Sequence, residues 1–228
     1  MKSNRDWDKN RRRDTTDLLG KVKDMPYHSY KMSTPIQIVP RIQSLELDNV
    51  GCWESLRLEF TPGLNIITGD PESLGKTTIL SSIISEVSPS NDMGLFAPPV
   101  APGKSRIVVQ LMPSGGTFLA GSRGTIPPQT GEESHGQYMM RLLKSSLATA
   151  EPDGAVIFDD EVFRGLDDAR RSEAVKWLNE TTAQVIYVAP RWMDLDALPK
   201  AKVFVCSWDK ERDQAEMSVR QQGQQTGP

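Results

Sequence analysis

Cysteine is scarce in this chain of 228 residues, which contains only Cys52 and Cys206. Two cysteines cannot build the disulfide framework of a small secreted domain or a cysteine-rich metal site. The chain also lacks any apolar run near the ~20 residues that a membrane-spanning helix needs, and no signal-peptide pattern is present. These absences predict a soluble, cytoplasmic protein without membrane contact.

Acidic and basic residues nearly balance, with a net charge of −3, but they are unevenly spread. Residues 1–33 hold nine Lys or Arg against five Asp, a charge of +4, so the remainder carries −7. The first stretch is polar, has no sustained apolar period and contains Pro26 and Pro35. We therefore predict a flexible basic arm over residues 1–35, one domain over 36–208, and a flexible tail over 209–228.

Three consecutive arginines, Arg11 to Arg13, give the arm its strongest basic run. Such a run can bind nucleic acid or an acidic partner, and it can equally be a solvated charge cluster. The sequence therefore leaves two interpretations open: the arm contacts DNA or another partner, or its charges are only solvated.

From Ile36 onward, apolar patterns predict alternating strands and helices. Strands are expected at about 41–47, 56–60, 64–68, 154–161, 184–190 and 202–208, with a hairpin over 105–122. Helices are expected over 77–87, 134–150 and 167–183. The fold class predicted from this order is α/β, with a mixed sheet, an N-terminal antiparallel part and flanking helices.

The stretch GDPESLGKTT, residues 69–78, is a near match to a phosphate-binding loop. The usual loop has four residues between its first Gly and the closing Gly-Lys-Thr, whereas five separate Gly69 from Gly75. Backbone N–H groups in such a loop surround phosphates, a lysine adds charge and a threonine hydroxyl binds Mg²⁺. The residues expected to bind ATP here are Gly69, Ser73, Gly75, Lys76, Thr77 and Thr78. The alternative is an ordinary turn that begins a helix.

A second motif, Val156 to Glu161, is a buried strand that ends in three acids. In phosphate-loop ATPases an aspartate at this place holds Mg²⁺, and the following glutamate polarises the attacking water. We assign Asp160 to the metal, because it directly precedes Glu161, and Glu161 and Lys76 to catalysis. Acids at a strand end can also be plain solvated caps.

Taken with these motifs, the sequence resembles the ABC-type ATPases. The stretch DEVFRGLD, residues 160–167, has the spacing of their Asp-Glu pair and D-loop, and Ser134-His135-Gly136-Gln137 stands where their signature Ser-Gly-Gly-Gln opens a helix. The opening strands and the hairpin are similar to the RecF and SMC branch, whose heads serve DNA repair and chromosome maintenance. The resemblance implies ATP and Mg²⁺ as cofactors, with Ser134, Gly136 and Gln137 contacting ATP held by a second subunit.

Several features depart from that family. The strand QVIYVA runs into Pro190-Arg191 and supplies no switch histidine, the coiled-coil arm is missing, and Gln110 lies in a predicted strand where it faces solvent. Together with the longer loop, these losses predict an ATPase that is slow or that only binds nucleotide.

Two functions remain open on this basis. The first is an ATPase that dimerises around nucleotide in a DNA-associated process of repair, maintenance or defence. The second is a non-catalytic or nucleotide-gated module that docks into a larger DNA-processing assembly. The expected partners are accordingly a second copy of the chain or a heteromeric assembly.

Overall fold

The structure, a computed structural model, describes residues 35–69, 75–87, 104–113, 129, 131–150, 153–190, 194–209 and 214–221. The predicted basic arm, apart from residue 35, lies outside these residues, as do positions 70–74 of the phosphate loop. Within the described part of the chain, no helix is long and apolar enough to cross a membrane.

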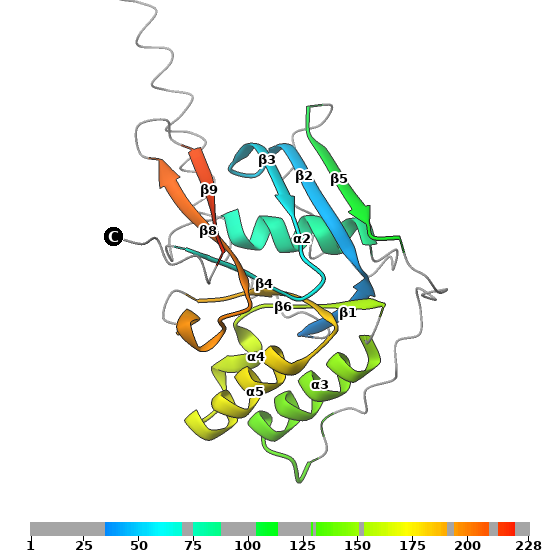
Figure 1. Cartoon of the computed structure of the whole chain (residues 1–228), viewed down its shortest axis with the longest axis vertical. Helices are drawn as coiled ribbons and strands as arrows, with labels where there is room; N and C mark the ends of the chain where they lie inside the picture. Colours follow the sequence, from blue (N-terminus) through cyan, green and yellow to red (C-terminus); the bar gives the residue numbers. More distant parts are fainter. Residues whose placement is uncertain are drawn as a thin grey trace, which may run out of the picture. The chain divides into compact units, whose positions relative to one another are not determined.

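The main sheet has six strands in the order β1-β6-β7-β4-β8-β9 (Figure 1). Its centre is four parallel strands: β4 (Leu64–Gly69), β6 (Gly154–Phe158), β7 (Gln184–Val188) and β8 (Lys202–Asp209). The edge strands β1 (Ile36–Pro40) and β9 (Gln214–Gln221) run antiparallel to their neighbours. Strands β4, β6 and β7 are buried along their whole length, which is why their sequences are continuous apolar runs.

A second sheet of three antiparallel strands has the order β3-β2-β5. It consists of β2 (Ile42–Val50), β3 (Trp53–Glu59) and β5 (Arg106–Leu111). Alternation between buried and exposed residues in β3 matches a sheet with one packed face and one solvated face. The sheet confirms the antiparallel part that the sequence predicts near the N-terminal side of the domain.

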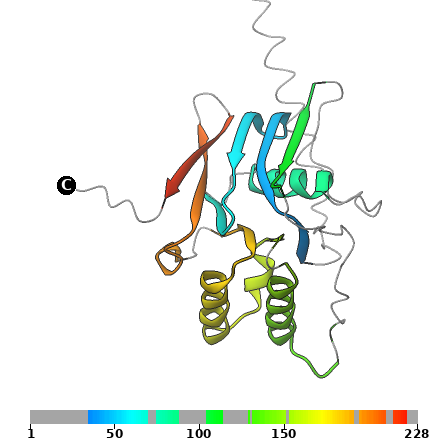
Figure 2. The ribbon, with the colours of Figure 1, turned by 45° about the vertical axis from the view of Figure 1, so that its right-hand side comes forward.

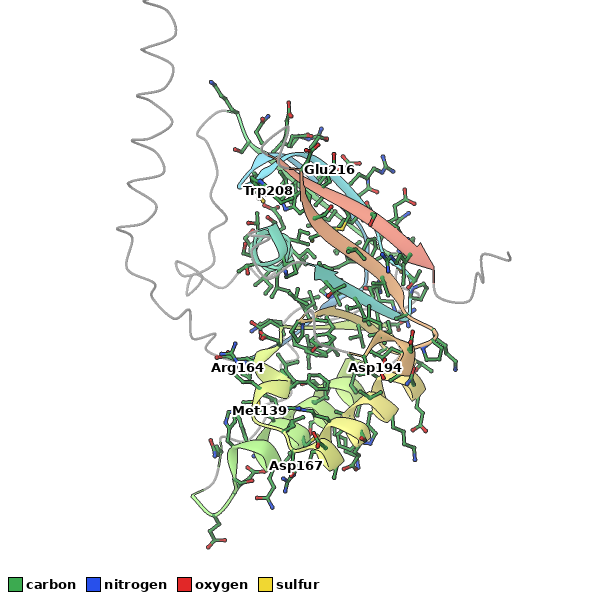
Figure 3. All side chains as sticks on the ribbon, turned by 90° about the vertical axis from the view of Figure 1, so that its left-hand side faces the viewer. Met139, Arg164, Asp167, Asp194, Trp208 and Glu216 are labelled. Carbon is green, nitrogen blue, oxygen red and sulfur yellow. The ribbon has the colours of Figure 1, made fainter. Side chains whose placement is uncertain are left out.

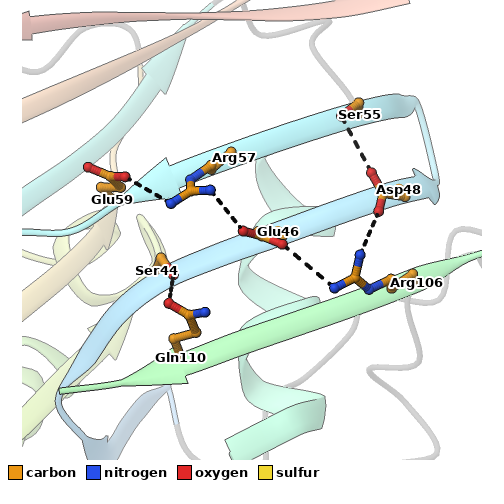
Figure 4. A network of polar contacts seen from close by, with 8 residues as sticks. All are labelled: Ser44, Glu46, Asp48, Ser55, Arg57, Glu59, Arg106 and Gln110. Carbon is orange, nitrogen blue, oxygen red and sulfur yellow. Dashed lines mark hydrogen bonds and ion pairs between the residues drawn. The ribbon is translucent and has the colours of Figure 1, made fainter. Parts of the chain in front are cut away.

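The solvated face of this second sheet carries a network of ion pairs (Figure 4). Arg57 of β3 bridges Glu46 and Glu59, and Arg106 of β5 bridges Glu46 and Asp48. Both arginine side chains are 64% exposed, so each pair contributes at most about 1 kcal/mol. The network therefore contributes little to the stability of the fold.

The helices lie on both faces of the main sheet. Helix α2 (Gly75–Val87) packs between the main sheet and the second sheet, in a core that includes Ile67, Ile79 and Leu58. Helices α3 (His135–Ala150), α4 (Glu161–Arg164) and α5 (Asp168–Glu180) cover the opposite face, in a core that includes Ile66 and Leu143. Adjacent residues of β4, Ile66 and Ile67, thus point to opposite faces, as the pleat of a strand requires. Figure 2 shows α3 and α5 side by side.

Figure 3 shows the side chains of these layers, with Met139 among the helices and Trp208 and Glu216 on the β8–β9 ribbon. The helix predicted over 134–150 is present as α3, and the apolar residues on one of its faces are all buried: Met139, Leu142, Leu143 and Leu147. A short 3₁₀ helix, η2 (Leu195–Ala197), precedes β8.

One buried amide joins the two sheets. Gln184, at the start of β7, accepts a hydrogen bond from the Ile42 N–H at 2.7 Å. Its Nε2 donates to the carbonyls of Ile42 and Thr61, both at 2.8 Å. Because an unpaired buried amide is costly, this satisfied side chain fixes how the start of β2 meets β7.

The structure adds a strand at each end of the domain. The flexible tail predicted over 209–228 is wrong in part, because Gln214–Gln221 form β9, paired along its length with β8. The strand predicted at about 41–47 is present as β2, and Ile36–Pro40 form a further strand, β1, that pairs with β6. Strand β1 pairs with the distant β6, and β9 is a mostly polar edge strand in a hairpin with β8, so local apolar patterns reveal neither of them. Of the predicted hairpin, β5 is present and its second strand lies outside the described residues.

Candidate nucleotide-binding site

Both ends of the phosphate loop are glycines in places that no side chain can enter. Gly69 ends β4 with φ +144°, and a Cβ there would lie 2.0 Å from the Cys206 carbonyl oxygen. Gly75 begins α2, and a Cβ there would lie 2.5 Å from Cζ2 of Trp53. Trp53 is 1% exposed, and its Nε1 donates a hydrogen bond to the Gly75 carbonyl at 3.1 Å. The loop between these glycines is therefore held at both ends by tertiary contacts.

Lys76 reaches from the start of α2 to the end of β4. Its half-buried side chain donates from Nζ to the Gly69 carbonyl at 3.4 Å. Thr77 is exposed and Thr78 is buried, and the first turn of α2 contains no acidic residue. A helix N-terminus with adjacent lysine and hydroxyl groups, and without carboxylates of its own, favours an anion.

The acids follow β6 directly. Asp159 is partly buried, and burial raises its pKa to about 6, with the charges of Asp160 and Glu161 adding to the rise. Its Oδ1 accepts a hydrogen bond from the Glu161 N–H at 3.0 Å. Asp160 forms an ion pair with Arg164 at 3.4 Å, and Glu161 begins α4. Asp159 thus holds the backbone of Glu161, a role that the sequence did not predict.

Strand order brings the loop and the acids to one edge. Strand β7 pairs in parallel with β4 on one side and with β6 on the other. The carboxyl ends of all three strands, at Gly69, Phe158 and Val188, consequently lie at the same edge of the sheet. Ligands of open α/β sheets bind at this edge.

A magnesium ion fits the donors at this edge when a phosphate completes its coordination. Among the described residues, no group of three or more His, Cys, Asp and Glu could hold a metal alone. Mg²⁺ in nucleotide sites is bound by one or two protein oxygens together with phosphate oxygens and water. The hydroxyl of Thr77 and the carboxylate of Asp160 are hard oxygen donors of that kind.

The signature segment forms a capping box. Ser134 Oγ accepts from the Gln137 N–H at 3.3 Å, and Gln137 Oε1 accepts from the Ser134 N–H at 2.9 Å. This reciprocal pair starts α3, and the spacing S-x-x-Q could have revealed it in the sequence. Glu133, the residue before this segment, accepts two hydrogen bonds of 2.9 and 2.8 Å from the Arg141 side chain of α3.

The signature segment also contacts the D-loop of its own chain. A Cβ on Gly136 would lie 3.0 Å from the Gly165 carbonyl oxygen, and a Cβ on Gly165 would lie 2.7 Å from the His135 ring. Asp167, at the end of the D-loop, caps α5 by accepting from the Arg170 N–H at 2.9 Å. The structure thus brings Gly136 to Gly165, while α2 and α3 lie on opposite faces of the main sheet.

The segment after β7 has no histidine, as the sequence indicates; Pro190 follows Ala189, and residues 191–193 lie outside the described part. Tyr187 of β7 is fully buried and stacks on Phe158 and Phe163, with ring centroids 4.7 and 5.2 Å away. Burial raises the pKa of its hydroxyl, which has no hydrogen-bond partner among the described residues. Gln110 is exposed in β5 and accepts from Ser44 Oγ at 3.1 Å, as expected for a structural residue.

Comparison with solved structures identifies the fold. The head domain of SMC from Thermotoga maritima aligns with a TM-score of 0.51 and 14% identity, over 79% of this chain and 99% of that one. An SMC head bound to the C-terminal winged-helix domain of ScpA aligns with a TM-score of 0.54 and 14% identity, over 80% and 98%.

Sequence similarity to known proteins is short. The Septu protein PtuA of Bacillus thuringiensis is 52% identical over 42 residues, which are 18% of this chain and 10% of that protein. No family model matches the chain. The resemblance that the motifs indicate is confirmed at the level of the fold: the chain has the fold of SMC head domains.

Proposed function

We propose that the chain binds ATP and Mg²⁺ at the loop from Gly69 to Thr78 and hydrolyses ATP slowly. The observation that carries this proposal is the common edge of β4, β7 and β6, because the glycine loop follows β4 and the acids follow β6 at that edge. The N-terminus of α2 carries no acid that would repel a phosphate. The loop glycines and Ser73 would surround the phosphates, and Thr77 and Asp160 would hold the ion.

Glu161 is the proposed base that orients and polarises the attacking water. Asp159 supports it by accepting the Glu161 N–H at 3.0 Å, which fixes the start of α4 beside the strand end. The ion pair of Asp160 with Arg164 has to give way when Asp160 takes the metal. The missing switch histidine removes one contact to the γ-phosphate, which is why we expect slow turnover.

The placement of the signature segment supports a proposed dimer. The main sheet lies between α2 and α3. Ser134, Gly136 and Gln137 are therefore proposed to close over ATP held by a second copy, with the Gly136–Gly165 contact aligning signature and D-loop together. Such an assembly would serve a DNA-associated process of repair, maintenance or defence, with the basic arm contacting DNA.

The second candidate function is a nucleotide-gated docking module without significant hydrolysis. It is favoured by the SMC head that is bound to a winged-helix domain of ScpA, since a head of this fold can present a surface to a partner. The longer phosphate loop and the absent histidine point the same way.

ATP binding is tested by titrating the full chain with ATP in the presence and absence of Mg²⁺. Lys76→Ala removes the charge that offsets the β- and γ-phosphates, and it should weaken binding at least tenfold. The matched control is Lys176→Ala, which removes an exposed lysine from α5. Equal ATP affinity in Lys76→Ala and the parent chain would reject the site, and binding without ATP turnover would select the docking module.

A further inference from the structure

We infer that Trp53 is a positioning residue for the nucleotide site, acting through the peptide bond between Gly75 and Lys76. This inference rests on the proposed ATP site and adds a residue from the second sheet to it. Trp53 lies 22 positions before Gly75 and begins β3.

The contact is specific in both shape and hydrogen bonding. The indole N–H donates to the Gly75 carbonyl at 3.1 Å, within a buried environment. The ring also fills the space beside the Gly75 Cα, since a Cβ there would lie 2.5, 2.7 and 2.9 Å from its Cζ2, Cε2 and Nε1 atoms. A rigid ring that is 1% exposed cannot move aside.

The peptide unit that receives this bond faces the proposed phosphate site. Its carbonyl belongs to Gly75 and its N–H to Lys76, and the two groups of a trans peptide point in opposite directions. In the first turn of α2 that N–H points out of the N-terminal end of the helix. A donor on the carbonyl polarises the whole peptide unit, so the Lys76 N–H becomes a stronger donor toward an anion.

Trp53 is itself fixed by two sheets. It pairs with Val50 across the two-residue turn of Gly51 and Cys52, where Gly51 has φ +60°. The Cys52 carbonyl accepts from the Ala215 N–H of β9 at 3.4 Å. The indole therefore presents its N–H from a rigid corner. Gly69 pairs with Cys206 of β8, and Gly75 accepts the Trp53 hydrogen bond, so both ends of the loop are fixed.

The test compares Trp53→Phe with Trp177→Phe in the full chain. Phenylalanine keeps an aromatic ring but loses the donor, so we expect the dissociation constant for MgATP to rise about fivefold, the scale of one lost hydrogen bond. Trp177 is partly buried on the helical side, and its replacement should leave this constant unchanged. Thermal unfolding without nucleotide establishes that each variant is folded at the temperature of titration.

A spectroscopic readout separates positioning from a purely structural role, and it needs no folded Trp53 variant. In the parent chain labelled with ¹⁵N-tryptophan, the Trp53 indole N–H resonance should shift on addition of MgATP. Its assignment follows by elimination from single Phe variants of Trp7, Trp177, Trp192 and Trp208.

Three outcomes are distinct. Weaker binding in Trp53→Phe together with the shifted resonance supports the inference. Parent-like affinity in a folded Trp53→Phe, or an unshifted indole resonance in a chain that binds MgATP, overturns the inference and leaves the proposed function standing. A parent chain that binds no MgATP overturns both.

Discussion

The carboxylate of Asp159 accepts a hydrogen bond from the backbone N–H of Glu161 at 3.0 Å, across the acid that lies between them. Asp159 is also the acid whose pKa burial raises to about 6, from an ordinary 3.8. Asp159 is therefore ionised at a cost in free energy, and its carboxylate orients Glu161, the proposed base.

The replacement Asp159→Asn should stabilise the nucleotide-free protein at pH 8. The pKa of Asp159 is higher in the folded state than in the unfolded state, so ionising this acid destabilises the fold. The protein has its full stability below about pH 4 and loses part of it as the pH rises through about 6. At pH 8 the variant should gain about 3 kcal/mol in free energy of unfolding, and the gain should vanish near pH 3.5. Chemical denaturation at both pH values measures it, and a gain independent of pH would contradict the assignment.

Glu161→Gln should preserve nucleotide binding and abolish turnover, since the amide keeps the shape of the side chain but cannot accept the proton. ATP should then accumulate in a stable dimer, detected by analytical sedimentation with MgATP. Glu173→Gln on the exposed side of α5 is the matched control and should remain as active as the parent. A Glu161→Gln chain that stays monomeric with MgATP bound would count heavily against the head-to-tail dimer.

Gly136→Ala tests the contact between signature and D-loop. Alanine is the better helix former by about 1 kcal/mol, so an unconstrained replacement in α3 would stabilise the protein. Here the new Cβ meets the Gly165 carbonyl at 3.0 Å, and we expect instead a loss of about 1 kcal/mol in unfolding free energy. Gly131→Ala, where no atom lies within 4 Å of the new Cβ, should be neutral. A Gly136→Ala protein that is more stable than its parent would show that the Gly165 carbonyl moves away from the new Cβ at no cost.

DNA binding, if the basic arm carries it, should depend steeply on salt. Each phosphate that the arm neutralises adds about 0.9 to the slope of log affinity against log salt for duplex DNA. Deleting residues 1–33, which carry +4, should flatten that slope and leave ATP affinity unchanged. Fluorescence anisotropy with labelled duplex at several salt concentrations gives the slope, and a slope unaltered by the deletion would move the contact to the body of the protein.

Local patterns in the sequence determined the strands and helices of the domain centre and their burial, but not the edge strands β1 and β9. The continuous apolar runs of β4, β6 and β7 and the spaced apolar residues of α3 each predict their own burial. The order of the motifs predicted the fold, because glycine loop, signature, acids and D-loop are short segments whose residue types follow from local backbone geometry and chemistry.

Only the tertiary structure decided what each buried face packs against. The position of β7 between β4 and β6, the pairing of β1 with β6, and the indole of Trp53 against Gly75 all join segments that are separated in the sequence. Trp53 is one of five tryptophans, and nothing in its neighbourhood in the sequence distinguishes it from the others. The periodicity of apolar residues shows which side chains are buried. The residues that each of them contacts depend on strand order and register, which are set by the packing of the whole domain.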